Sequence, residues 1–83
     1  MTNKTFEYAG VSLYHGRTKI RWANDPSRIK LLAKQGHEKL DLIPLPSAMT
    51  KAQGVRYLQS INYGAGDPEI VEALKYTARK NPL

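Results

Sequence analysis

The chain of 83 residues contains no cysteine, and this absence excludes several kinds of site at once. Without cysteine there is no disulfide, no thiolate metal site and no cysteine nucleophile. Only two histidines occur, His15 and His37, and neither has an acidic or histidine cluster beside it at metal-ligand spacing. We therefore predict no zinc site and no cofactor. The lack of disulfides also fits a reducing cytoplasm.

Long apolar runs are missing as well. No stretch approaches the roughly 18 apolar residues of a membrane-spanning helix. The first ten residues, MTNKTFEYAG, lack the apolar core of a signal peptide. We therefore expect no membrane partner and a cytoplasmic location. The composition, with 41% hydrophobic and 24% charged residues, is typical of a soluble globular protein, and the length predicts a single domain over residues 1–83.

Acidic residues are few relative to basic ones, and the net charge is +6. The excess is uneven, because residues 1–40 carry eight Lys/Arg against three Asp/Glu, whereas residues 41–83 carry five against four. The excess positive charge is therefore concentrated in residues 1–40. It indicates an acidic partner such as nucleic acid, an acidic protein surface or an anionic metabolite. The alternative is that a small soluble protein simply carries excess charge.

The segment from Tyr8 to Ala23 predicts a β-hairpin that folds at His15 and Gly16. A glycine at the second turn position suits the positive φ of a tight turn. This turn pairs Tyr14 with Arg17 and fixes every other pair. Because side chains alternate across a strand, the hairpin has two faces. The core face collects Ala9, Val11, Leu13, Ile20 and Trp22, and the solvent face collects Tyr8, Ser12, Tyr14, Arg17, Lys19 and Arg21.

The remaining elements follow from capping residues and periodicity. Asp25 and Asp67, each followed by proline, predict helix starts, and Thr50 with Gln53 forms a capping box. The expected strands cover about 6–14, 17–23 and 39–44, and the expected helices cover about 26–35, 51–61 and 68–80. The order is ββαβαα. This is a small α+β domain, in which a three-stranded sheet with an N-terminal hairpin carries three helices on one face, and the third strand runs parallel to the second.

Two residues inside these elements have specific expectations. Trp22 is predicted to anchor the core, beside Val11 and Ile20. Gly54 lies within the second helix, where glycine costs about 1 kcal/mol relative to alanine, and either a close backbone approach or chance explains it. The buried stripe of that helix is expected to contain Ala52, Val55, Leu58 and Ile61.

Signals for catalysis are weak. None of the serines stands in a pattern with a base and an orienting group. Asp25 and Asp67 are interpreted as helix caps rather than as a catalytic carboxylate pair. The glycine-rich segment 64–66 lacks the spacing and the lysine of a phosphate-binding loop, so it is interpreted as a flexible connection. We predict that the chain is not an enzyme.

The basic residues of the first half form the candidate binding site. Three of them share one strand face and have no acidic cross-strand partner, and three more lie on the next helix. Cations contact phosphates, and aromatic rings stack on unpaired bases. The alternative is a solvated hairpin face. The candidate residues are Tyr8, Tyr14, Arg17, Lys19, Arg21, Arg28, Lys30 and Lys34.

The leading hypothesis is a small, basic, non-enzymatic binding module that acts on nucleic acid or a nucleoprotein machine. The second is a protein-binding regulator, an inhibitor or adaptor that docks on an acidic surface of a larger enzyme. Tyr57 and Tyr63, expected to be exposed near the glycine-rich segment, favour a protein interface. An accessory subunit of an enzyme comes third and a free-standing enzyme last. Pairing of edge strands would also give a homodimer.

Overall fold

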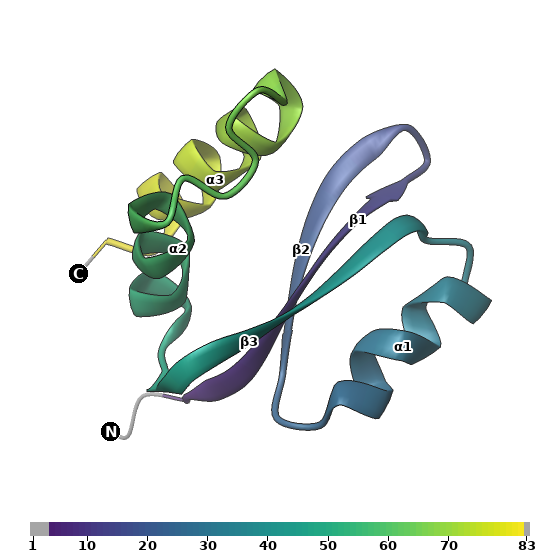
Figure 1. The fold of residues 1–83 in the computed structure, drawn as a ribbon, viewed down its shortest axis with the longest axis horizontal. Helices are drawn as coiled ribbons and strands as arrows, with labels where there is room; N and C mark the ends of the chain where they lie inside the picture. Colours follow the sequence, from purple (N-terminus) through teal and green to yellow (C-terminus); the bar gives the residue numbers. More distant parts are fainter. Residues whose placement is uncertain (1–3, 83) are drawn as a thin grey trace.

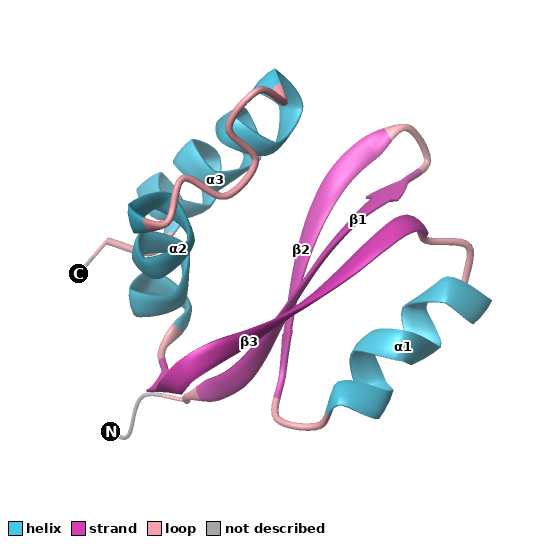
Figure 2. Cartoon of the chain, in the orientation of Figure 1, coloured by secondary structure: helices cyan, strands magenta, loops and turns pink. Residues whose placement is uncertain are grey.

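Three strands and three helices follow one another in the ββαβαα order predicted from the sequence. They are seen in a computed structural model that describes residues 4–82 (Figures 1 and 2). The α+β class is confirmed. Within residues 4–82 no helix is long and apolar enough to cross a membrane. The strands are β1 (Phe6–Tyr14), β2 (Arg17–Ala23) and β3 (Glu38–Met49), and the helices are α1 (Pro26–Lys34), α2 (Lys51–Ser60) and α3 (Pro68–Lys80).

Strands β1 and β2 form the predicted hairpin. His15 and Gly16 have φ angles of 50° and 75°, and positive values at both positions are typical of a type I′ two-residue hairpin turn. The pairing then runs without a shift as far as Tyr8 opposite Ala23. The observed pairs match the predicted register, which is confirmed. The register was predictable because the position of a tight turn fixes every pair that follows it.

The central strand of the sheet is β1, and both of its neighbours run antiparallel to it in the order β2-β1-β3. Strand β3 therefore points in the same direction as β2, as predicted, with β1 between them. It continues past Pro44 and Pro46 to Met49, beyond its predicted end. The prolines are tolerated because β3 is an edge strand, where a missing N–H need not interrupt the ladder.

Each helix begins at its predicted cap. Asp25 and Asp67 each accept a hydrogen bond from the backbone N–H two residues later, at 3.0 and 3.1 Å. Thr50 Oγ1 accepts from the N–H of Gln53 at 3.2 Å, and Gln53 Oε1 accepts from the N–H of Thr50 at 3.0 Å. These bonds satisfy donors that have no partner inside a helix, and this explains why the helix starts were predicted accurately.

Helices lie on both faces of the sheet, so the predicted arrangement on one face is wrong (Figure 1). Helices α2 and α3 pack on the face of Trp22, where Gly54 meets the indole ring. Helix α1 packs on the opposite face, where a Cβ added to Gly10 would lie 2.6 Å from Ile29 Cγ2. The physical reason is that Gly10 has no side chain, which leaves room for Ile29 against the strand.

The main apolar core lies between the sheet and the pair α2 and α3. Trp22 packs against this core while keeping some exposure, in agreement with the predicted core face. Ile61, expected in the buried stripe of α2, is 47% exposed because the helix ends at Ser60, before reaching it. The buried residues of the core are Ala9, Val11, Ile43, Val55, Leu58 and Leu74.

Candidate binding surface

Arg17, Lys19 and Arg21, here called the β2 cations, lie along an edge of the sheet, because β2 has β1 as its one strand neighbour. Their partners across the hairpin are uncharged residues of β1. Arg17 and Arg21 are exposed, and Lys19 is half-buried. Within residues 4–82 the one ion pair joins Lys75 to Glu72, so the β2 cations have no carboxylate partner. Their charges are available to a partner molecule.

The face of the hairpin that was expected to be solvated is partly covered, and for Ser12 the prediction is wrong. Ser12 and His37 are 4% and 8% exposed, and Ser12 Oγ shares a hydrogen bond of 2.6 Å with His37 Nδ1. His37 follows α1, which packs over this face. His37 therefore covers Ser12, and it is brought there by α1, which the sequence analysis did not place on a second face of the sheet.

The Ser12–His37 pair is interpreted as structural rather than catalytic. A nucleophile needs a base that is itself held by a third group, and no carboxylate in residues 4–82 bonds the His37 ring. Burial lowers the pKa of His37, and the positive charges of Arg21, His15 and Lys19 lower it further. A neutral, hydrogen-bonded imidazole results. The same residues contain no group of three His, Cys, Asp or Glu side chains able to hold a metal ion.

The two candidate tyrosines have different surroundings. The ring of Tyr14 stacks on His37 with centroids 4.4 Å apart and an angle of 20°, and it meets His15 edge-on at 4.1 Å. Tyr8 is half-buried opposite Ala23. One face of the Tyr14 ring is thus already occupied, and stacking of an unpaired base on it has to compete with the imidazole.

The cations of α1 are all exposed. Helix α1 covers the same face of the sheet that carries the β2 cations, and Arg28, Lys30 and Lys34 point away from Ile29, its buried residue. None of the three lines the cleft described below. The structure therefore places the six predicted cations on one side of the sheet but in two groups.

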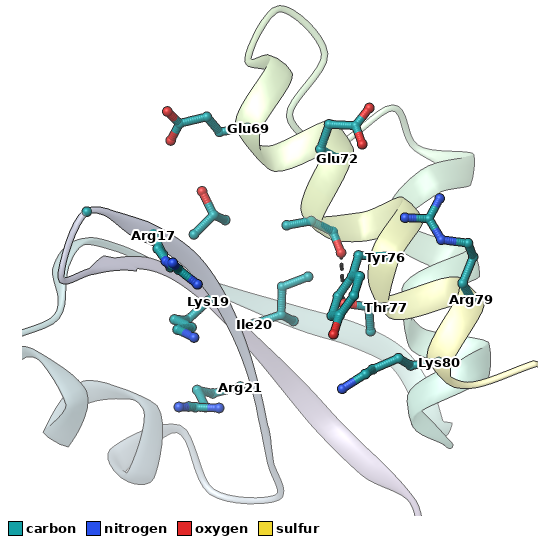
Figure 3. A pocket seen from close by; sticks show the side chains of 13 residues that line it. Arg17, Lys19, Ile20, Arg21, Glu69, Glu72, Tyr76, Thr77, Arg79 and Lys80 are labelled. Carbon is teal, nitrogen blue, oxygen red and sulfur yellow. Dashed lines mark hydrogen bonds between the residues drawn. The ribbon is translucent and has the colours of Figure 1, made fainter.

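A cleft of about 720 Å³ separates β2 from α3, and its lining includes the β2 cations and, on α3, Arg79 and Lys80 (Figure 3). The sequence analysis missed Arg79 and Lys80. Their place in the last turn of α3 is fully explained by the helix dipole, and no sequence signal shows that α3 lies along β2. The pairing of a basic strand with a basic helix end comes from the tertiary packing alone.

The cleft has an apolar side and a charged side. Ile20 of β2 points toward α3, whereas the β2 cations point away from it (Figure 3). Tyr76 of α3 is 52% exposed in the cleft, and Lys80 Nζ lies 5.1 Å from the centre of its ring. Glu69 and Glu72 line the end nearest the hairpin turn. Five cations and two carboxylates therefore line the cleft, and the positive excess is greatest away from the turn.

Tyr57 and Tyr63, which were expected to be exposed, instead pack against the core and are half-buried. The hydroxyl of Tyr63 donates to Asp41 Oδ2 at 2.6 Å. Burial raises the pKa of Tyr63, and the hydrogen bond to Asp41 raises it further. These two tyrosines have structural roles. The aromatic residue that is exposed in the cleft is Tyr76.

Comparisons with protein families, with curated proteins and with solved structures found no match for the chain. The chain is therefore described by its fold and its surface alone. It is a small α+β protein in which a basic edge strand lies beside a helix, with a cleft between them.

Proposed function

We propose that this chain is a small, basic, non-enzymatic binding module that acts on nucleic acid or a nucleoprotein machine. The β2 cations carry the proposal, because they stand in a row along β2 and have no ion-pair partner within residues 4–82. Folding thus gathers them without neutralising them. Arg28, Lys30 and Lys34 of α1 extend the positive field over the same side of the sheet.

The proposed contact is to the phosphate backbone. Lysine and arginine side chains neutralise phosphates and release counterions, and this interaction is independent of base sequence. Base stacking has a smaller part, because the ring of Tyr14 is stacked on His37. We therefore expect binding to both single-stranded and double-stranded probes, with little preference between sequences.

The test is a salt titration of binding to oligonucleotides. Arg17→Ser, Lys19→Ser and Arg21→Ser are combined in one variant. It should retain the fold, because Arg17 and Arg21 are exposed, Lys19 is half-buried, and surface substitutions usually change stability by less than about 0.5 kcal/mol each. Loss of three phosphate contacts should flatten the slope of log K against log salt by about 2 to 3. The matched control combines Lys39→Ser, Arg56→Ser and Lys75→Ser, exposed cations none of which lines the cleft. Equal slopes in the two variants, or no binding by the parent at low salt, would overturn the proposal.

A second candidate function is a regulator that docks on an acidic surface of a larger protein. One observation favours it specifically. Tyr76 is an exposed aromatic residue beside the open edge of β2, and tyrosine is enriched at the centres of protein interfaces. A pull-down from lysate with and without nuclease separates the two candidates, because only a partner held through nucleic acid is lost on digestion.

A further inference from the structure

The outer edge of β2 is open to another strand. Strand β2 pairs with β1 along one side, and within residues 4–82 its other side has no strand neighbour. The other edge of the sheet differs, because β3 contains Pro44 and Pro46, which lack the N–H that a ladder needs. No proline interrupts β2. Of the two edges, β2 is the one with a full set of backbone donors and acceptors.

Helix α3 forms the second wall of a groove along this edge. The cleft between them is lined by Ile20 of β2 and by Ala73, Tyr76 and Thr77 of α3. Ile20, Tyr76 and Thr77 are labelled in Figure 3, and Tyr76 is exposed. The Thr77 hydroxyl already donates to the carbonyl of Ala73 at 2.8 Å, so this hydroxyl is not a free donor in the groove. An extended chain laid beside β2 would therefore find a backbone ladder on one side and apolar contacts on the other.

The alternation of β2 determines the side chains that such a chain needs. Successive side chains of an added strand point to the same two faces as those of β2. On one face they would lie beside Arg17, Lys19 and Arg21, and on the other beside Ile20 and the apolar residues of α3. Directly opposed side chains of adjacent strands interact, and opposite charges there are favourable. The matching ligand alternates acidic and apolar residues.

We propose that the β2 edge binds an extended segment of a partner protein, in which acidic and apolar residues alternate, as a fourth strand of the sheet. This inference rests on the protein-docking candidate above. The β2 cations contact the acidic side chains, Tyr76 contacts the apolar ones, and the β2 backbone provides the hydrogen bonds.

A second copy of this chain does not fit the same edge. Pairing of two β2 strands would bring the cations of one copy beside those of the other, and like charges directly opposed are destabilising. The cations thus protect the edge against self-association while leaving it complementary to an acidic strand.

The probe is an acetylated and amidated heptapeptide of alternating Glu and Val, which matches the seven residues of β2 in length. In an extended strand all Glu N–H groups point to one edge and all Val N–H groups to the other. Two further peptides are therefore N-methylated, one at every Glu and one at every Val. Strand addition predicts that one of them loses binding by at least about tenfold and the other does not. Equal binding by both, or by a peptide with Glu and Val in separate blocks, would overturn the inference.

Variants of the protein separate this inference from the nucleic-acid proposal. Tyr76→Ser should weaken binding of the heptapeptide by about tenfold, as expected for a central aromatic contact, and leave oligonucleotide binding within about twofold. Leu31→Ser is the control, because Leu31 is 48% exposed on α1, away from the groove. Hydrogen exchange should show new protection of β2 amides with the heptapeptide.

Each result has a defined meaning. No binding of the heptapeptide together with salt-dependent oligonucleotide binding overturns the inference and leaves the nucleic-acid proposal standing. Heptapeptide binding that is insensitive to Tyr76→Ser overturns the groove assignment. If the variant in which serine replaces the β2 cations still binds both the heptapeptide and the oligonucleotide as the parent does, the inference and the nucleic-acid proposal are both overturned.

Discussion

Gly54 of α2 lies directly against the six-membered ring of Trp22, so closely that a Cβ at this position would come within 2.8 Å of the ring carbon Cη2. The glycine that weakens α2 by its intrinsic propensity is thus the residue that lets the helix pack on the sheet. Of the two explanations open at the sequence level, a close backbone approach is confirmed. The contact joins α2 to β2 and closes one side of the core.

Replacing Gly54 by alanine should destabilise the protein. The helix-propensity gain of about 1 kcal/mol is opposed by overpacking against the indole, which typically costs about 1–3 kcal/mol. Urea unfolding measures the difference in the free energy of unfolding. In a Trp22→Leu background, which removes the ring, Gly54→Ala should be neutral or stabilising. A loss of the same size in both backgrounds would contradict the packing interpretation.

Trp22→Ala should destabilise the protein by about 3 kcal/mol, the lower end of the range for large aromatic residues in cores, because Trp22 keeps some exposure. Its ring contacts Gly54 and lies 6.4 Å from the centre of Phe6. The measurement is thermal unfolding by circular dichroism. An unchanged melting temperature would show that Trp22 belongs to a recognition surface instead.

The local part of this fold was predictable from the sequence. The turn at His15 and Gly16 fixes the hairpin register, and the caps Asp25, Thr50 and Asp67 fix the helix starts, because each depends on residues a few positions apart. These signals act within one element or one turn. They do not state which face of the sheet a helix will cover.

The long-range part was not predictable for a physical reason. Ser12 was expected on a polar, solvated face, yet it is buried there and hydrogen-bonded to His37. The missing side chain of Gly10 lets Ile29 of α1 reach the same strand. Arg79 and Lys80 read as dipole partners of α3, yet the packing of α3 along β2 places them in a cleft with the β2 cations. In both cases the deciding fact is a contact between elements, and no periodicity within either element encodes it.

The stability of the fold should fall as the pH drops through the range in which the His37 imidazole takes up a proton. Burial and neighbouring cations lower the pKa of His37 below its ordinary value of 6.5, so the unfolded chain binds a proton more readily than the folded one. The contribution of His37 to the free energy of unfolding is complete above about pH 7.5. It declines as the pH falls below about 6.5 toward the lowered pKa of His37. Urea unfolding from pH 5 to pH 8 checks this.

A His37→Gln variant provides the control for that experiment, since glutamine can still bond Ser12 but does not titrate. Its stability should vary less with pH across this window than the stability of the parent. The same slope in both proteins would assign the dependence to other groups. Asp25, whose pKa is lowered by its hydrogen bond to Ser27, acts only at more acidic pH.

His37 should also report the binding of an acidic partner. After burial, the charges of Arg21 and Lys19 contribute to the lowered pKa of its imidazole, so a polyanion that neutralises them should raise that pKa part of the way back. Burial remains, and the value should stay below 6.5. By linkage, the partner should then bind more tightly as the pH falls through the same range. Nuclear magnetic resonance titration of the His37 Cε1–H, with and without a saturating oligonucleotide, measures the shift. Arg21→Ser should raise the pKa of the free protein and reduce the further shift on binding. An identical pKa with and without ligand would mean that the oligonucleotide does not contact Arg21 or Lys19.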